Sequence, residues 1–527
     1  MLPTLPIGVA LQGVTRRGGK ASPDEDSSGA RRRVESGGGT VPSTNDGATR
    51  LLSVATELRS RSGASSFVRR WQEAVQTNMR HKKHTYTRER DSMRAEVDNQ
   101  QSVVTSFVRA ARSGGADDAL ADSQTSTWDV AEKVSSRWQS LVLQSASLDQ
   151  LIRRAQERFD LMNNATDFAM LRAEFAVAIE RLATDFRSQS VLLDAVCDVI
   201  EAFVKSPLVG SNAYLNFVLM GRPGVGKTRL ATSLASVLGK LGILIYDDVV
   251  VCGRSDFVAE YEGQTTTKSR TFLMANLEKC VFLDEAYSLT TWESSRDEGR
   301  VLSGYSGEAV AEIVATLSQR VGATVLIAAG YERQMLNDFL PSNEGLRRRF
   351  PYMIWLSDYS AEELIDIYLK SVAVALSDPH PAPLLTHDVV RSYYTTTALN
   401  FLTDVLAGAC ETTTNGARHP LLSALVVAQA GFAVQLASTS ALLIASSKRR
   451  GDIGIGGASG SDTWAIGYMD VRAIWETLLS QQLGPQVREA LGELDTIATE
   501  AGWRTEGGAW QVPPAPSARL RERRGAR

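Results

Sequence analysis

Cysteine and histidine are scarce in this sequence. Its 527 residues include 4 cysteines and 5 histidines, and the cysteines at 197, 252, 280 and 410 lie far apart along the chain. Zinc sites and disulfide frameworks both need such residues at short, regular spacings. The sequence therefore argues against both kinds of site. We expect reduced thiols in an intracellular protein, in the cytoplasm or in an organelle.

The chain also lacks a large net charge of one sign. Lys and Arg number 57, Asp and Glu 60, and the formal net charge is −3. This balance gives no global attraction to nucleic acid or to an anionic membrane, and neither partner is expected. The first residues, MLPTLPIGVALQG, lack the basic segment that opens a secretory signal, so no cleaved leader is expected. The arginines in the last nine residues predict a solvated tail, with a nucleic-acid arm left open.

Long uncharged runs are rare, and the run from His419 to Ser447 is the exception. Its length makes it a candidate membrane span. Glutamine and a Ser-Thr-Ser cluster interrupt it, which favours a buried helix pair in a helical domain. A membrane contact of residues 421–445 stays open at this point.

Composition and periodicity divide the chain into segments of different character. Gly, Ser and Arg dominate the start, apolar residues then recur every three or four positions, and short branched runs later alternate with helical patterns. The expected segments are a disordered 1–50, an all-α N-terminal extension at 51–205, an α/β core at 206–358, a helical lid subdomain at 359–483 with a flexible loop at 452–462, and a C-terminal helix with a basic disordered tail at 484–527.

Four strand-length apolar runs mark the middle of the chain: Leu215–Met220, Ile243–Val251, Cys280–Leu283 and Thr324–Ala328. Helical patterns separate them. Strands that alternate with helices favour βαβ units and a parallel sheet covered on both faces. The fold class expected for this segment is therefore α/β.

A phosphate-binding loop follows the first of these runs. The pattern G-x-x-x-x-G-K-[ST] is met by Gly221, Arg222, Pro223, Gly224, Val225, Gly226, Lys227 and Thr228. Glycines let backbone N–H groups turn toward phosphate oxygens, and the helix that begins here adds its positive end. Lys227 is expected to contact the β- and γ-phosphates of ATP, and the Thr228 hydroxyl is expected to bind Mg²⁺.

Two carboxylates follow the third run, at Asp284 and Glu285. Acids at the end of a buried strand are costly to desolvate unless a cation or water needs them. We expect Asp284 to hold Mg²⁺ and Glu285 to orient or deprotonate the attacking water. Farther on, Arg347–Arg349 precede Phe350; an arginine from a neighbouring subunit can stabilise charge on a transferring phosphoryl group.

With these motifs in place, the sequence resembles the AAA+ ATPases, and among them the CbbX and stage V sporulation protein K (CfxQ-like) group. The segments GRPGVGKT, GRSDFVAEYEGQTTTKSR, VFLDEAYSL, VLIAAGY and NEGLRRRF occur in the order found in that group. The resemblance implies a P-loop core with a five-stranded parallel sheet and a C-terminal helical lid. Residues 1–205 have no counterpart in it.

The resemblance also assigns roles to individual residues. Residues 221–228 look like the Walker A loop, and Asp284 and Glu285 look like the Walker B pair. Arg349 matches the arginine finger, and Arg418 is similar to the sensor 2 arginine of the lid. The central pore loop, whose aromatic residue grips a substrate polypeptide, is matched by Tyr261, Glu262 and Gly263. The strand VLIAA ends without Asn or Thr, so no sensor 1 residue is assigned.

The function expected from this resemblance is that of an ATP-hydrolysing motor subunit, most simply in a homo-hexamer, that remodels a protein partner. ATP and Mg²⁺ are the implied cofactors, and the CbbX branch acts on Rubisco, which nothing in this sequence establishes as the partner here. Two alternatives stay open: an ATP-binding scaffold or signalling protein with little turnover, and a nucleic-acid-directed ATPase.

Overall fold

The computed structural model describes residues 47–60, 65–113, 121–208, 213–261, 263–290, 292–295, 299–376, 387–392, 394–410, 412–413, 416–417, 419–426, 429–450, 468–506 and 509–511. Several expectations fall outside these residues and are not tested by it: the disorder of residues 1–46, the loop at 452–462, the tail from 512, Glu262 and Arg418. The expected disorder of residues 47–50 is wrong, because these residues form the first turn of the helix Gly47–Arg59, in which Ala48 and Leu51 are buried.

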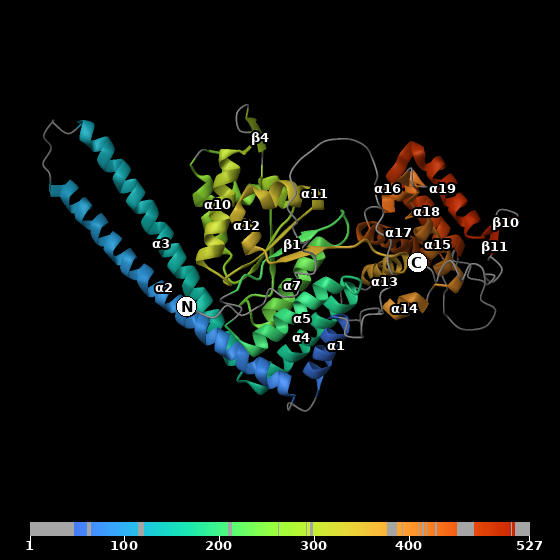
Figure 1. The fold of residues 1–527 in the computed structure, drawn as a ribbon, viewed down its shortest axis with the longest axis horizontal. Coiled ribbons are helices and arrows are strands. Elements are labelled where there is room, and N and C mark those ends of the chain that lie inside the picture. Colours follow the sequence, from blue (N-terminus) through green and yellow to red (C-terminus); the bar gives the residue numbers. More distant parts are fainter. Residues whose placement is uncertain are drawn as a thin grey trace, which may run out of the picture. The chain divides into compact units, whose positions relative to one another are not determined.

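A parallel five-stranded sheet forms the centre of the α/β core (Figure 1). Its strand order is β2-β3-β6-β1-β7, and every pairing is parallel. The strands are β1 (Phe217–Met220), β2 (Val249–Cys252), β3 (Cys280–Leu283), β6 (Val325–Gly330) and β7 (Tyr352–Trp355). The α/β class and the five-stranded parallel sheet expected from the sequence are confirmed.

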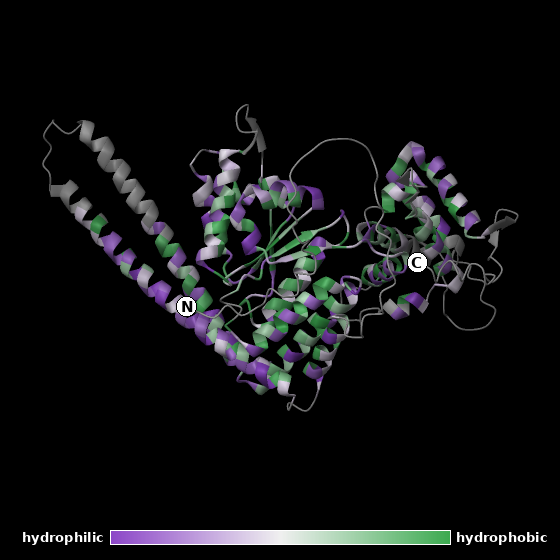
Figure 2. Ribbon diagram, in the orientation of Figure 1, coloured by the Kyte–Doolittle hydropathy of each residue, from purple (hydrophilic) through white to green (hydrophobic). Residues whose placement is uncertain are grey.

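Helices cover both faces of this sheet, so apolar side chains alternate between two hydrophobic clusters. Along β1, Phe217 and Leu219 belong to one cluster, and Val218 and Met220 belong to the other. Successive residues of these strands are accordingly hydrophobic, and the strands of the sheet are largely green in Figure 2. The helices of the core are α7 (Lys227–Leu241), α8 (Arg254–Phe257), α9 (Thr265–Ala275), α10 (Gly304–Gln319), α11 (Glu332–Gln334) and α12 (Glu344–Arg349).

One expected strand is shorter than its sequence pattern indicates. The apolar run that begins at Ile243 forms strand β2 only from Val249 onward. Ile243, Leu244 and Ile245 are buried in the preceding loop, where the Ile245 N–H donates to the carboxylate of Glu278. Burial without strand pairing explains why this segment has the composition of a strand. A short hairpin, β4 (Trp292–Ser295) with β5 (Gly299–Leu302), also precedes α10.

The N-terminal extension is helical, as its periodicity predicts. Its helices are α1 (Gly47–Arg59), α2 (Ser66–Ser113), α3 (Ala121–Leu161), α4 (Ala165–Asp185) and α5 (Ser190–Lys205). Trp71, Phe175 and Ile200 share one hydrophobic cluster with Phe217 of the sheet and Leu234 of α7. The extension and this face of the sheet are therefore built around a common core.

The C-terminal helices pack around a hydrophobic cluster of their own. They are α13 (Ala361–Leu376), α14 (His387–Ser392), α15 (Thr396–Ala409), α16 (Pro420–Val426), α17 (Ala430–Arg450), α18 (Tyr468–Leu483) and α19 (Val487–Glu500); the short strands β8 (Thr412–Thr413), β9 (Gly416–Ala417), β10 (Arg504–Glu506) and β11 (Ala509–Gln511) pair as two hairpins. Ala490, Leu494 and Trp503 are buried in this cluster, so the helical subdomain continues past residue 483.

The long uncharged run forms two helices that are bent relative to each other. α16 and the α17 segment Ala430–Leu442 meet at 94°, and only as a pair do they have the length and composition of a span. Within the described residues, no single helix meets that criterion. Leu422, Phe432 and Leu436 of this pair lie in the hydrophobic cluster of the subdomain.

Candidate functional site

The P-loop connects β1 to α7 and depends on two glycines in left-handed backbone conformations. Gly224 and Gly226 have φ of +77° and +84°, values that side chains with a Cβ rarely adopt. A Cβ at Gly226 would also lie 3.2 Å from the Tyr359 hydroxyl. The loop delivers Lys227 to the first turn of α7, where its Nζ donates to the carbonyls of Gly221 at 3.0 Å and Arg222 at 2.9 Å.

The acidic pair lies at the same edge of the sheet. β3 ends at Leu283, and the carboxyl ends of parallel strands meet on one side. The Asp284 N–H donates to the Cys252 carbonyl, and the Glu285 N–H donates to Asp284 Oδ1 at 3.0 Å. Glu285 itself has a left-handed φ of 48°, which turns the chain sharply after the strand.

One cavity of about 700 Å³ brings the two motifs together. Pro223, Gly224, Gly226, Lys227 and Thr228 line it, together with Asp284 and Glu285. Gly330, the last residue of β6, and Tyr331, which follows it, line it as well. Of the other Walker A residues, Val225 is buried, Gly221 accepts from Lys227, and Arg222 pairs with Asp358 at 3.1 Å.

Residues 217–354 match a family model described as "ATPase family associated with various cellular activities (AAA)". Residues 217–354, which are similar to that family, are called the AAA domain below. The match covers the sheet, the P-loop and the acidic pair, and it confirms the AAA+ resemblance expected from the motifs.

Curated relatives of the AAA domain agree with this assignment. ESX-1 secretion system protein EccA1 of Mycobacterium tuberculosis is 36% identical over 152 residues, which cover 29% of this chain and 26% of that protein. Stage V sporulation protein K of Bacillus subtilis is 35% identical over 164 residues, 31% of this chain and 48% of that protein. A CfxQ homolog of Galdieria sulphuraria is 33% identical over 164 residues, 31% and 51% respectively. The chain thus spans about a quarter to a half of these relatives.

Solved structures with related folds are far more distant. A mutant of Thermotoga maritima RuvB is 13% identical, with a TM-score of 0.31 over 66% of this chain and 95% of that one. At that score the likeness carries no argument about function.

Charge and burial distinguish Lys227 from an ordinary surface lysine. Burial lowers its pKa, and the negative charges of Asp284 and Glu285 oppose that shift. Burial raises the pKa of Tyr287 and of Tyr359, two further residues of the cavity, to about 12. A partly buried ammonium group beside two carboxylates suits a triphosphate with Mg²⁺. Phosphate oxygens would pair with the charge of Lys227, and the metal would pair with the charges of the two carboxylates.

The C-terminal helical subdomain also contributes residues to the lining of the cavity. Ala430, Gly431 and Val434 of α17 line it, and the Ala430 N–H donates to the Gly224 carbonyl at 3.0 Å. The Tyr359 hydroxyl donates to the Val225 carbonyl at 3.1 Å. Residue 418, assigned to sensor 2 by resemblance, is not described, so that assignment stays a prediction.

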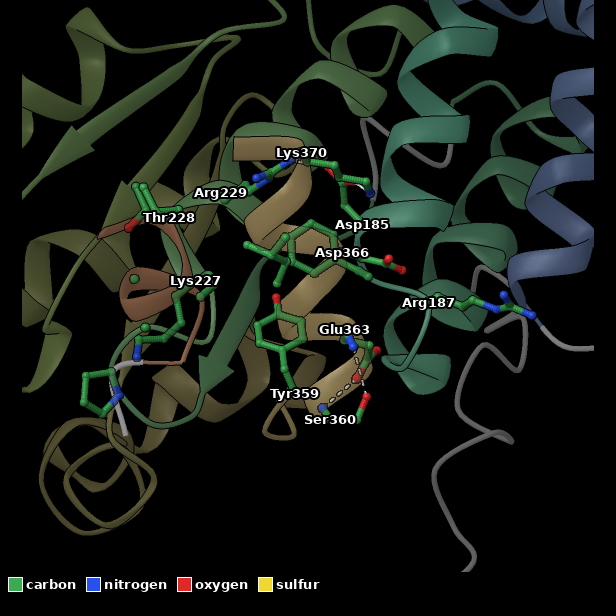
Figure 3. A pocket seen from close by; sticks show the side chains of 18 of the residues that line it. Asp185, Arg187, Lys227, Thr228, Arg229, Tyr359, Ser360, Glu363, Asp366 and Lys370 are labelled. Carbon is green, nitrogen blue, oxygen red and sulfur yellow. Dashed lines mark hydrogen bonds and ion pairs between the residues drawn. The ribbon is translucent and has the colours of Figure 1, made fainter. Parts of the chain in front are cut away.

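Among the charged residues of the cavity that no motif identified, three form ion pairs with one another. They are Asp185 at the end of α4, Arg229 of α7 and Lys370 of α13 (Figure 3). Arg187 also lines the cavity, although in Figure 3 its side chain extends away from Lys227. Arg229 directly follows the P-loop motif, but neither Asp185 nor Lys370 belongs to a recognisable pattern, because they come from distant parts of the chain. The only local signal for Asp185 is that an acid ends the helix Ala165–Asp185.

Three more assigned residues, Tyr261, Gly263 and Arg349, are not among the residues that line the cavity. Arg349 donates through Nε and Nη2 to Ser318 Oγ at 3.1 and 2.6 Å, and through Nη1 to the Gly345 carbonyl at 3.1 Å. It is not among the residues that line the cavity. Of the assigned pore loop, Tyr261 is 68% exposed and Gly263 has a φ of +77°.

Proposed function

We propose that the chain is an ATP-hydrolysing AAA+ subunit that works in a homo-oligomeric ring, most simply a hexamer, and remodels a protein partner. The observation that carries the proposal is the single cavity lined by both Lys227 and Thr228 of the P-loop and by the carboxylates of Asp284 and Glu285. A phosphate-binding turn without acids would suit many anions. The acids add the means to hold a metal and activate water.

Each residue has a defined part in this proposal. Lys227 contacts phosphate oxygens, and the Thr228 hydroxyl and Asp284 hold Mg²⁺, which would neutralise charge on the phosphates when bound. Glu285 accepts a proton from, or orients, the attacking water. Arg349 serves the cavity of a neighbouring subunit, since its own guanidinium is bonded to Ser318.

The exposed Tyr261 supports a protein as the partner. An aromatic ring that is 68% exposed, beside a glycine with positive φ, is suited to transient contact with a polypeptide. The names of the relatives refer to a secretion system and to sporulation, but they do not identify the partner of this chain. The scaffold and nucleic-acid alternatives remain as outcomes of the test below.

Phosphate release by wild type and Glu285→Gln tests the proposal. Removal of the general base should lower turnover by about 10²- to 10³-fold, while calorimetry should show that ATP still binds. Glu489→Gln, which changes an exposed acid of α19, serves as the matched control and should keep wild-type turnover.

Equal rates for wild type and Glu285→Gln would refute the hydrolytic role. Tight ATP binding by a wild-type protein that does not release phosphate would favour the scaffold. Turnover that requires DNA or RNA, and that falls steeply with salt, would favour the nucleic-acid-directed alternative.

A further inference from the structure

One carboxylate beside the cavity joins three parts of the chain. Asp185 Oδ1 accepts from Lys370 Nζ at 2.8 Å, and Oδ2 accepts from Arg229 Nη2 at 2.6 Å (Figure 3). The three residues belong to α4 of the extension, α13 of the lid and α7 after the P-loop. The Asp185 side chain is only 16% exposed, so both ion pairs are partly shielded from water.

Asp185 and Arg229 lie on helices that pack in the same hydrophobic core. α4 and α7 share a hydrophobic cluster to which Leu182 and Phe186, on either side of Asp185, also belong. Asp185 and Arg229 are therefore fixed relative to each other. Lys370 instead lies on α13, whose buried residues belong to the hydrophobic cluster of the lid.

We propose that Asp185 is a positioning residue that holds the lid over the nucleotide cavity through Lys370, and so sets nucleotide affinity. The inference rests on the nucleotide binding proposed above. A movement of the lid would break the Asp185–Lys370 pair and leave the Asp185–Arg229 pair intact. Since α13 and α17 form one wall of the cavity, a displaced lid would remove contacts from a bound nucleotide.

The charges predict an unequal effect of the two substitutions. Lys370→Met removes the attraction but leaves Asp185 with Arg229. Asp185→Asn removes the attraction and also leaves two cations, Arg229 and Lys370, facing each other without their shared anion. Repulsion between them then disfavours the closed lid. Removing Lys370 as well should relieve that repulsion.

The test is a double-mutant cycle on the dissociation constant for ADP, measured by calorimetry. Lys370→Met should weaken binding about 3- to 10-fold and Asp185→Asn at least as much. The double variant should bind no more weakly than Asp185→Asn alone, and Lys370→Arg should restore most of the affinity. Lys205→Met is the matched control. It removes the exposed ion pair between Lys205 and Glu201 on α5 and should bind ADP as the wild type does.

A second measurement tests the pair without nucleotide. Hydrogen exchange of residues 356–361, which connect β7 to the first residue of α13, should be faster in Asp185→Asn than in Lys205→Met. Additive effects in the cycle, or unchanged affinity and unchanged exchange, would overturn the inference. The wild-type protein could bind no ADP while hydrogen exchange at 356–361 is still faster in Asp185→Asn than in Lys205→Met. That result would refute the proposed function and support the positioning role of Asp185.

Discussion

At the scale of single residues, Lys227 shows how a binding site is prepared for its ligand. Its ammonium group is bonded to two P-loop carbonyls, and burial lowers its pKa from the ordinary 10.5. A lysine in this condition gains more from a phosphate than a solvated one, because the phosphate replaces hydration that burial has already removed. The proton on Lys227 is therefore linked to nucleotide binding.

This linkage predicts that ADP affinity falls as pH rises. A phosphate favours the charged form, so it raises the pKa of Lys227, and above the pKa of the free protein binding must take up a proton. From neutral pH toward the ordinary lysine value of 10.5, affinity should therefore fall progressively. Calorimetry across this range, in buffers of differing ionisation enthalpy, measures both the affinity and the proton uptake.

Lys227→Arg is the control for this experiment, because guanidinium stays charged throughout the range. Tyr287 and Tyr359, with pKa values of about 12, also keep their protons there. The difference in pH dependence of ADP affinity between the wild type and Lys227→Arg thus gives the contribution of the Lys227 proton. A wild-type affinity as flat with pH as that of the arginine variant would contradict the linkage.

At the scale of elements, the docking of α2 onto the AAA domain depends on buried polar contacts. Trp71 Nε1 donates to the Leu241 carbonyl at 2.9 Å, and Asn78 Nδ2 to the Gly242 carbonyl at 2.8 Å. One turn farther on, Lys82 forms an ion pair with Glu278, whose other oxygen accepts from the Tyr86 hydroxyl. The extension is thus attached to the core by directional bonds as well as by apolar packing.

Lys82→Met should destabilise the protein strongly. The Lys82 and Glu278 side chains are only 4% and 1% exposed, so the substitution leaves a carboxylate buried without its cation. The expected loss is about 3 kcal/mol in the free energy of unfolding, measured as an earlier transition in urea. Lys83→Met, at the exposed neighbouring position, should change it by less than about 0.5 kcal/mol. Equal shifts for the two variants would show that the buried pair contributes nothing specific.

The elements of the core could be predicted from the sequence because their signals are local. Glycines at fixed spacing define the P-loop, and Asp284 and Glu285 directly follow an apolar strand. Ion pairs between distant segments leave no such pattern: 185 positions separate Lys370 from Asp185, and 196 separate Glu278 from Lys82. For the same reason the sequence suggested an extension separate from the AAA domain, whereas the structure gives them a common core.

At the scale of the whole molecule, the role proposed for Arg349 involves a second copy of the chain. Its guanidinium is bonded to Ser318 and Gly345, and it does not line the cavity of its own subunit. Under the proposed function, Arg349 acts on a nucleotide held by a neighbour. Arg349→Ala should then bind ATP normally and lose about 10³-fold in turnover.

Mixing two inactive variants separates this arrangement from an effect within one subunit. Arg349→Ala keeps Glu285, and Glu285→Gln keeps Arg349, so a mixed ring contains interfaces with both groups intact. Random assembly of equal amounts makes about a quarter of the sites complete. Phosphate release from co-expressed variants should therefore exceed that of either variant alone, with Arg347→Ala as a control that keeps full activity. A mixture no more active than its parts would mean that Arg349 acts within its own subunit or not at all.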